Sequence, residues 1–273
     1  MLTERDQRFV EELLSRHAGL ALTNEQGRLV SARLTSLAKQ RNLTTADELI
    51  EALRRAPVGA LLDSVIEALT THETSFFRDQ QPFVALSEHV IPELIESRRV
   101  QRSLSIWSAA CSTGQEPYSV AMLLQERFPA LASWQVRIWG TDVSQVVVQR
   151  ARAGTFTERE VQRGISKSAR EKYFERSGEL WRVREPIRRM VSWQTFNLAA
   201  PWPTLSTFDI ILMRNVLIYF SAETRARILA QTAAQLTPDG YLLLGNSETT
   251  FGVCDELHPR ALSATVVYRK SSR

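Results

Sequence analysis

Polar residues that could bind a cofactor follow directly after a short apolar run, Leu104–Ala109. They include Gly114, Glu116 and Pro117: the glycine lets the backbone approach a ligand, and the proline suits the first turn of a helix. The fingerprint G-x-G-x-x-G is absent, and the Glu116 carboxylate would repel a diphosphate. The turn therefore favours a cationic or neutral ligand and disfavours a nicotinamide dinucleotide.

A second acid follows the next apolar run. Asp142 comes after Gln135–Thr141, about one βα unit later, where an acid can accept hydrogen bonds from a ribose diol. Alternatively, Asp142 caps a helix beginning at Ser144, and the residue alone does not decide between the two. Together with Glu116, it indicates a nucleoside whose other end carries an ammonium or sulfonium group. S-adenosylmethionine has both features.

A third polar group closes the run Phe208–Met213. Arg214 and Asn215 follow this run in what should be a partly buried cleft, where an arginine needs an anion to pair with. Tyr219 comes five residues after Arg214, and aromatic residues at such positions commonly belong to the core.

An unusual string precedes all three groups, His72-Glu73-Thr74-Ser75-Phe76-Phe77-Arg78-Asp79. We expect Phe76 and Phe77 to bury against the sheet domain. They would then hold Thr74 and Arg78 over the mouth of the site.

The elements that must position these residues change character along the chain. Residues 1–71 carry apolar residues at three- to four-residue spacing, which predicts a small bundle of four helices. From Ser103, apolar runs alternate with helical stretches, which is typical of βαβ units and a parallel sheet. The strands are expected at Leu104–Ala109, Gln135–Thr141, Met190–Phe196, Phe208–Met213, Tyr241–Asn246 and Ala264–Arg269, and the helices at Tyr118–Phe128, Ser144–Ala153 and Ala222–Leu236. The alternation in Leu180–Arg189 predicts a small antiparallel excursion at the edge of the sheet.

The composition of the 273 residues, 44% hydrophobic and 23% charged, is that of a globular protein with one large or two modest domains. No apolar run approaches the ~20 residues that span a bilayer. The first six residues lack the apolar core of a signal peptide, and two cysteines do not make a disulfide framework. These features predict a reduced, cytoplasmic protein without membrane insertion.

The net charge of +4 is unevenly distributed. Residues 150–189 contain 12 Lys or Arg and 6 Asp or Glu, whereas residues 26–46 contain Arg28, Arg33, Lys39 and Arg41 and no acid. Either cluster alone reads as solvated surface. The longer one would permit RNA, but it lacks an interleaved aromatic platform and a recognised RNA-binding module. We therefore expect no nucleic-acid partner.

The strings E-T-S-F-F-R-D, A-C-S-T-G-Q-E-P-Y-S, T-D-V-S, F-N-L and R-N-V-L-I-Y-F, in this order and spacing, resemble the CheR family of chemotaxis receptor methyltransferases. The resemblance covers essentially the whole chain and implies a protein-glutamate O-methyltransferase that uses S-adenosylmethionine and no metal. It implies an all-α N-terminal domain (1–71) and a Rossmann-like α/β methyltransferase domain (72–273). A small antiparallel β-subdomain is expected at about 173–189.

The resemblance also assigns roles to residues. Glu116 would take the methionine ammonium and Asp142 the ribose, while Arg78 and Tyr219 would border the reacting methyl group. The full set of implied cofactor contacts is His72, Thr74, Arg78, Glu116, Asp142, Asn197, Leu198, Arg214 and Asn215, of which Asn197 and Leu198 would lie beside the adenine. His72 stands where many members of the family have asparagine.

The family's substrate is an acidic helical bundle in the cytoplasmic part of a chemoreceptor, so the basic helix within residues 26–46 becomes a docking surface. The turn Ser177-Gly178-Glu179 is shorter and poorer in glycine than in members that grip a receptor's C-terminal tether. We therefore expect a tether-independent monomer. Two other hypotheses stay open: a methyltransferase of RNA or of a small acid, and a non-catalytic member that binds cofactor or a signalling ligand.

Overall fold

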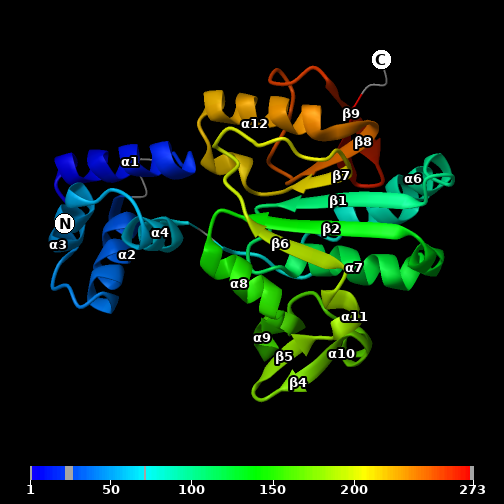
Figure 1. Cartoon of the computed structure of the whole chain (residues 1–273), viewed down its shortest axis with the longest axis horizontal. Coiled ribbons are helices and arrows are strands. Elements are labelled where there is room, and N and C mark those ends of the chain that lie inside the picture. Colours follow the sequence, from blue (N-terminus) through cyan, green and yellow to red (C-terminus); the bar gives the residue numbers. More distant parts are fainter. Residues whose placement is uncertain (1, 22–26, 71, 271–273) are drawn as a thin grey trace. The chain divides into compact units, whose positions relative to one another are not determined.

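The computed structural model describes residues 2–21, 27–70 and 72–270, and these form two compact units (Figure 1). Unit 1 comprises residues 1–72 together with Asn197–Pro201 and Tyr219–Arg225. Unit 2 comprises Glu73–Phe196, Trp202–Ile218 and Ala226–Arg273. Two short segments far along the sequence thus group with the N-terminal helices.

Unit 1 is built on the four expected helices: α1 (Glu4–Ala18), α2 (Gly27–Gln40), α3 (Ala46–Arg55) and α4 (Ala60–Leu69). Their apolar faces form the core, in which Val10, Leu34 and Leu49 are fully buried. The start of α1 is fixed by Thr3, whose side chain accepts the Asp6 N–H in a capping box. Asn197 and Ala21 then bring in the two later segments, because the Asn197 side chain donates to the His17 carbonyl at 2.7 Å and the Ala21 N–H donates to the Tyr219 carbonyl at 2.8 Å.

Unit 2 contains a seven-stranded sheet with the order β6-β2-β1-β7-β8-β10-β9. Its strands are β1 (Ser103–Ala109), β2 (Gln135–Asp142), β6 (Val191–Thr195), β7 (Phe208–Met213), β8 (Leu236–Leu244), β9 (Leu257–Leu262) and β10 (Thr265–Lys270). The first five are parallel, whereas β10 runs antiparallel to both β8 and β9. The strand order reverses between β1 and β7, which is where an open α/β sheet binds ligands. The chain is therefore a Rossmann-like α/β protein with an all-α N-terminal region.

Helices cover both faces of this sheet. Figure 1 shows α12 (Ala222–Gln235) on one side and α7 (Gln115–Arg127) and α8 (Gln145–Ala153) on the other. The remaining helical segments of this kind are α5 (Gln81–Ala85), the π-helical turn η2 (Leu86–Val90), α6 (Ile91–Ser97) and the 3₁₀ turns η3 (Pro129–Ser133) and η4 (Leu217–Tyr219). Every residue of β7 is buried, as expected for a central strand with both faces covered.

A separate three-stranded sheet with the order β3-β5-β4 forms the small subdomain. Its strands are β3 (Thr155–Phe156), β4 (Phe174–Ser177) and β5 (Leu180–Val183), accompanied by α9 (Glu158–Gln162), α10 (Lys167–Tyr173) and α11 (Glu185–Arg188). The expected excursion at the edge of the main sheet is therefore wrong in two respects. The strand Leu180–Val183 pairs only within this small sheet among the described residues, and the alternation ends at a helix where Pro186 occupies the first turn.

Two aromatic residues anchor the segment that leads into unit 2. Phe76 is 1% exposed, and its ring makes edge-on contacts with Phe156 at 4.9 Å and Phe174 at 5.4 Å, both on the small sheet. Phe77 packs edge-on against Phe83, and its N–H donates to the Ser119 hydroxyl of α7 at 2.9 Å. Both phenylalanines thus fix this segment within unit 2.

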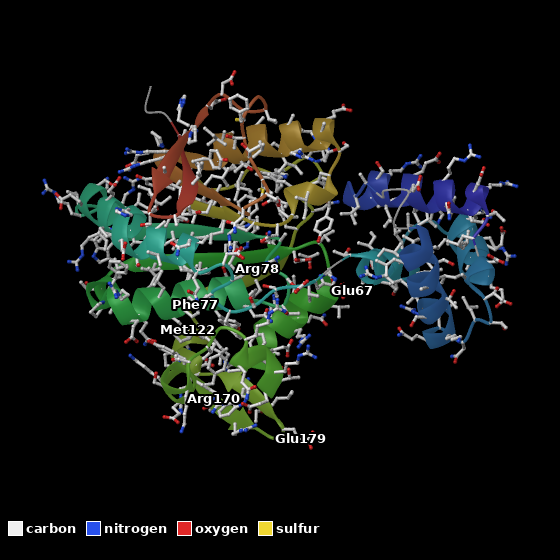
Figure 2. The ribbon with its side chains drawn as sticks, turned by 180° about the vertical axis from the view of Figure 1, so that it is seen from behind. Glu67, Phe77, Arg78, Met122, Arg170 and Glu179 are labelled. Carbon is white, nitrogen blue, oxygen red and sulfur yellow. The ribbon has the colours of Figure 1, made fainter. Side chains whose placement is uncertain are left out.

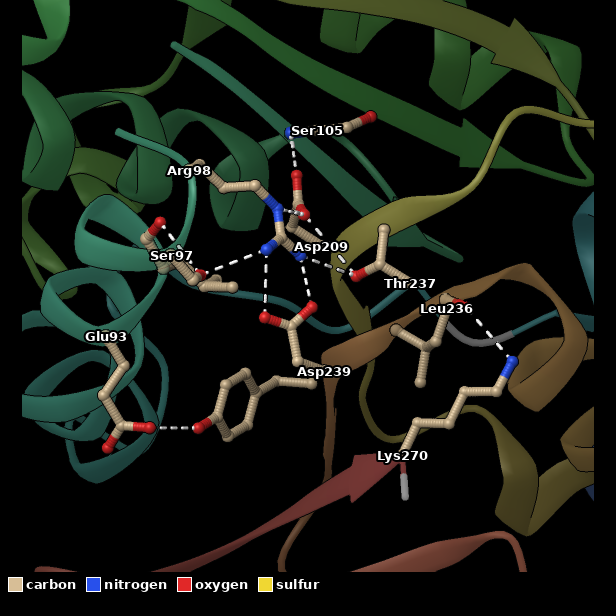
Figure 3. Close-up of polar contacts among 11 residues, drawn as sticks. Glu93, Ser97, Arg98, Ser105, Asp209, Leu236, Thr237, Asp239 and Lys270 are labelled. Carbon is tan, nitrogen blue, oxygen red and sulfur yellow. Dashed lines mark hydrogen bonds and ion pairs between the residues drawn. The ribbon is translucent and has the colours of Figure 1, made fainter. Parts of the chain in front are cut away.

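A charged cluster ties the sheet together near the amino ends of its strands (Figure 3). Arg98 donates from Nε to Asp209 at 2.8 Å and from its terminal nitrogens to both oxygens of Asp239, while Asp209 also accepts the Ser105 N–H at 2.9 Å. The side chains of Arg98 and Asp209 are 15% and 7% exposed. The cluster joins the end of α6 to β1, β7 and β8, far from the carboxyl ends of the strands.

We expect Arg98→Met to lower the free energy of unfolding by about 3–5 kcal/mol, because it leaves buried carboxylates without their partner. Urea denaturation measures this loss. Arg99→Met is the matched control, since Arg99 is 72% exposed and pairs only with Glu96 one helical turn away; its effect should stay within about 0.5 kcal/mol. Equal effects of the two substitutions would contradict the assignment.

The same substitution should change the acid sensitivity of the fold. The hydrogen bond from Arg98 lowers the pKa of Asp239 below its ordinary value of 3.8. A lowered folded-state pKa contributes stability above pH 3.8 that is lost as the pH falls through the folded-state value. Denaturation of Arg98→Met should therefore depend less steeply on pH below that point than denaturation of the wild type.

Candidate active site

The register of the parallel strands brings the residues that follow them to one edge of the sheet. Ala109 of β1 aligns with Thr141 of β2, Ser108 aligns with Leu212 of β7, and Met213 aligns with Leu244 of β8. The turns that begin after these residues therefore meet beside the point where the strand order reverses. Glu116, Asp142 and Arg214 come from three different turns at this edge.

Glu116 lies at the centre of a buried hydrogen-bonded cluster. Its Oε1 accepts the Ser108 hydroxyl at 2.8 Å, and its Oε2 accepts Arg214 Nη1 at 3.0 Å. Arg214 Nη2 donates to Asp79 Oδ2 and to the Arg78 carbonyl, both at 2.8 Å. The Arg214 side chain is 2% exposed, so its role in this structure is to hold two carboxylates and a backbone carbonyl in place.

The charges of this cluster do not cancel. Arg214 contributes one positive charge, whereas Glu116 and Asp79 contribute two negative charges, and their side chains are 13% and 31% exposed. A buried charge needs a partner, and Arg214 supplies only one for the two acids. The remaining negative charge makes this edge of the sheet suited to a cationic ligand group.

Asp142 joins two neighbouring turns. It is 5% exposed, and its carboxylate accepts the Ser112 N–H at 2.9 Å and the Ser144 N–H at 3.1 Å. The cap of α8 is Ser144, whose side chain accepts the Val147 N–H. Asp142 is thus not the N-cap of that helix. A carboxylate has about four acceptor positions, so these two contacts leave capacity for a diol.

Backbone strain concentrates around these residues. Nine non-glycine residues in the described parts of the chain have a left-handed backbone, and six of them lie in the three segments of the cluster: Phe77, Asp79, Gln80, Ala110, Ser112 and Asn215. Such conformations cost of order 1–3 kcal/mol each and persist where the surroundings hold them, commonly at functional sites. Gly114 also needs its small size, because a β-carbon there would lie 2.9 Å from both Ala151 and Trp193.

Arg78 lies within unit 2, beside Phe77 on the anchored segment (Figure 2). Its Nη1 donates to the Glu73 carbonyl at 2.8 Å, and its own carbonyl accepts Arg214. Thr74 is partly buried on the same segment. Arg78 is therefore joined directly to the Glu116 cluster through its backbone.

The other four expected site residues belong to unit 1: His72, Asn197, Leu198 and Tyr219. The Asn197 Oδ1 accepts the Ala199 N–H at 2.9 Å while its amide nitrogen holds the His17 carbonyl. His72 lies 3.4 Å from Glu67, measured from Nε2 to Oε1. Each of these residues is described within its own unit.

Three participants were missed from the sequence. Ser108 points from β1 to Glu116, Asp79 is the second acid on Arg214, and Glu248 accepts the Asn215 N–H at 2.7 Å. Reading the residues after β8, as was done for three other strands, would have found Glu248. Nothing in the sequence indicates the other two pairings, because they join residues that are distant along the chain or lie within a strand.

Cys111 sits in the turn after β1 but is buried, at 2% exposure. Burial and the nearby carboxylates of Asp142 and Glu116 raise the pKa of its thiol well above the ordinary value. The thiol is therefore not activated as a nucleophile. In the described parts of the chain, no group of three or more His, Cys, Asp or Glu is arranged to hold a metal ion.

The basic clusters are largely engaged in unit-internal contacts. In unit 1, Arg33 donates to the Leu69 and Thr70 carbonyls at the end of α4, Arg41 donates to Ser64, and Lys39 is exposed. The side chain of Arg28 lies outside the described part of the structure. In residues 150–189, the ion-paired cations are Arg150, Arg163, Arg170, Lys172, Arg176, Arg184, Arg188 and Arg189. Such pairing reduces the field that a polyanion would need.

No helix in the described residues is both long and apolar enough to cross a membrane.

Comparison with known proteins identifies close relatives. Residues 72–265 match the family described as CheR methyltransferase, SAM binding domain. The chain is 38% identical over 261 residues to chemotaxis protein methyltransferase Cher2 of Pseudomonas putida and, over the same length, to chemotaxis protein methyltransferase 1 of Pseudomonas aeruginosa; each alignment covers 94% of both chains. It is 34% identical over 272 residues to the chemotaxis protein methyltransferase of Vibrio parahaemolyticus, covering 98% of both chains. With the cation-selective edge of its parallel sheet, the chain belongs to the CheR family of S-adenosylmethionine-dependent methyltransferases.

Proposed function

We propose that this chain transfers the methyl group of S-adenosylmethionine to glutamate carboxylates of chemoreceptors, giving glutamate methyl esters and S-adenosylhomocysteine for sensory adaptation. The observation that carries the proposal is the net negative Glu116–Arg214–Asp79 cluster at the edge of the sheet, in a chain whose relatives are chemotaxis methyltransferases. The cluster offers a carboxylate to an amino acid ammonium group and none of the bare amides that a diphosphate requires.

The residues present fit this cofactor. Glu116 would hold the ammonium group, and Asp142, with acceptor capacity left after its two backbone contacts, would hold the ribose diol. Arg214 keeps the Glu116 carboxylate in position from behind. Asn197 and Leu198 follow β6 directly and are proposed to lie beside the adenine.

The reaction does not need a general base. A glutamate side chain has a reference pKa of about 4.3, so at neutral pH the acceptor is already a carboxylate nucleophile. When bound, S-adenosylmethionine supplies a methyl group on a positively charged sulfur. The protein has to align the carboxylate with that methyl group and exclude water, which can contribute ~7–11 kcal/mol in well-oriented systems. We assign this alignment to Arg78, which can bind a carboxylate through two parallel hydrogen bonds, and to the hydroxyl of Tyr219.

Helix α2 is the proposed docking surface for the acidic receptor bundle. Lys39 and Arg41 are exposed, whereas Arg33 is partly buried and occupied with the end of α4. We therefore place the weight of docking on Arg28, Lys39 and Arg41, with Arg33 stabilising unit 1. We also propose that the protein acts as a cytoplasmic monomer without nucleic acid.

We predict that catalysis does not depend on a receptor tether. The hairpin between β4 and β5 pairs Ser177 with Leu180, so Gly178 and Glu179 alone form its tip (Figure 2 labels Glu179). Such a short turn offers little surface to grip a peptide. Titration of the full chain with a receptor tail peptide should show no binding at micromolar concentration, and micromolar affinity would overturn the prediction.

Asp142→Ala should weaken S-adenosylhomocysteine binding about 10- to 100-fold, because it removes acceptors for the ribose and releases the Ser112 turn. Calorimetry measures the affinity. Ser144→Ala is the control, since it removes the true cap of α8 and should cost about 1 kcal/mol of stability with little loss of affinity. Unchanged binding in Asp142→Ala would leave this carboxylate a purely structural role.

The proposed function is tested by two measurements on the purified protein. S-adenosylhomocysteine should bind, and NAD should not. Labelled S-adenosylmethionine should transfer its methyl group to membranes that contain chemoreceptors and not to RNA. Labelling of RNA or of a small acid in place of the receptor would favour the alternative substrates, and cofactor binding without transfer to any of them would favour a non-catalytic member.

A further inference from the structure

A buried carboxylate lies behind the turn that carries Arg214. Glu248 follows β8, is 9% exposed, and accepts four backbone N–H groups. Its Oε2 accepts those of Asn215 and Gly245, both at 2.7 Å. Its Oε1 accepts those of Val216 at 2.8 Å and Leu217 at 2.7 Å. One side chain thus satisfies three consecutive amides after β7 and one after β8.

These three amides need such a partner. The chain leaves the β-ladder after Met213, and Asn215 has a left-handed backbone with φ of 58°, so successive N–H groups converge on one point. A carboxylate can accept all of them, and its charge strengthens each hydrogen bond. A glutamine would offer one acceptor oxygen and would turn its own NH₂ group toward the remaining amides.

Gly245 is independent evidence that this contact is built into the fold. A β-carbon at Gly245 would lie 2.7 Å from Glu248 Oε2, 2.7 Å from Asn215 Nδ2 and 2.9 Å from the Asn215 nitrogen. Its φ is not left-handed, so alanine would be excluded by these contacts and not by backbone strain. The residue therefore has to be glycine for the carboxylate to approach the turn.

We infer that Glu248 is a positioning residue for the proposed methyl transfer, on which this inference rests. By fixing the amides of residues 215–217, it sets the position from which Arg214 reaches Glu116 and from which the chain continues to Tyr219. Glu248 does not need to touch substrate or cofactor to do this. The geometry assigns it to the support of the Arg214 turn.

The test compares Glu248→Gln with Glu256→Gln, a matched change at an exposed position further along the same loop. Hydrogen exchange of the amides of residues 215–217 and calorimetric affinity for S-adenosylhomocysteine are measured on the full chain. Glu248→Gln should speed exchange of these amides and weaken binding about tenfold or more, whereas Glu256→Gln should change neither. Gly245→Ala should reproduce both effects from the opposite side, and it replaces Glu248→Gln should that variant fail to fold.

Arg98→Met separates positioning from stability, because it destabilises unit 2 at the other end of the strands and should leave the affinity unchanged. Unaltered exchange at 215–217, or faster exchange with normal affinity, would overturn the positioning role. If loss of affinity in Glu248→Gln were matched by Arg98→Met at equal stability, the role would also fall. A wild-type protein that does not bind S-adenosylhomocysteine would instead refute the proposed function, and the positioning role with it.

Discussion

Glu116→Gln should reduce the affinity for S-adenosylhomocysteine about 10- to 150-fold while leaving the fold intact. Glutamine has the same shape and can still accept the Ser108 hydroxyl or Arg214, so the cluster keeps its packing. The change makes the Arg214–Asp79 pair electrically neutral and removes the charge-assisted bond to the ligand ammonium, which is worth about 1.5–3 kcal/mol. Calorimetry measures the affinity, and thermal denaturation checks the fold.

Glu126→Gln is the matched control for this prediction. Glu126 lies at the other end of α7, is 50% exposed and contacts Lys172 and Tyr173 on the surface. Its replacement should leave cofactor affinity unchanged. Asp79→Asn should produce a smaller loss than Glu116→Gln, because Asp79 acts on the ligand through the charge balance of Arg214. Equal affinity of Glu116→Gln and the wild type would contradict the cation-selective cluster.

The second large effect is expected for Arg78→Ala, with a fall in turnover of about 100- to 1,000-fold, the range seen when one donor that stabilises the reacting groups is removed. The loss should appear mainly in kcat, since the Arg78 side chain is proposed to orient the acceptor carboxylate. Arg78→Lys should recover only part of the rate, because lysine keeps the charge but not the paired hydrogen bonds. Initial rates with receptor-containing membranes measure both variants.

Arg163→Ala controls for loss of a nearby cation. Arg163 is 62% exposed and its side chain pairs with Glu73, the residue whose carbonyl accepts Arg78. It should keep wild-type turnover. Tyr219→Phe, which removes only a hydroxyl group, should lose turnover by a smaller factor than Arg78→Ala. Full activity of Arg78→Ala in a folded protein would remove this residue from the catalytic assignment.

The strands that carry the site could be predicted closely from the sequence. Phe208–Met213 has the expected bounds, and the strands ending at Ala109 and Asp142 differ by one residue at one end. These strands are central and buried on both faces, so they read as continuous apolar runs that end at polar turns. The same polar turns contain Glu116, Asp142 and Arg214, which is why rules of strand topology sufficed to select them.

The errors have physical causes. Leu257–Leu262 was not predicted as a strand because it is an edge strand with Pro259 in it and only its two ends buried. The strand β8 begins at Leu236 and not at Tyr241, since Pro238 and Gly240 read as a turn and the pairing with β7 shifts register there. Residues 81–97 form three short helical segments in which Pro82 and Pro92 interrupt an otherwise helical pattern.

The partners of the site residues could not be predicted, because they are long-range. The sequence shows that Arg214 needs an anion, but Asp79 lies 135 residues away and Glu116 lies 98 residues away. Likewise, Glu248 contacts amides more than thirty positions earlier in the chain. Only the folded sheet brings these turns to one edge.

The central claim is tested most directly by the chemical stability of the transferred methyl group. Purified protein is incubated with methyl-labelled S-adenosylmethionine and membranes that contain a chemoreceptor, and the labelled receptor is then treated with base. Glutamate methyl esters hydrolyse under these conditions, so the proposal predicts release of the label as methanol, and no labelling of receptor whose acceptor glutamates are replaced by alanine. Base-stable label on the receptor, or label that ends on RNA or a small acid, would contradict it.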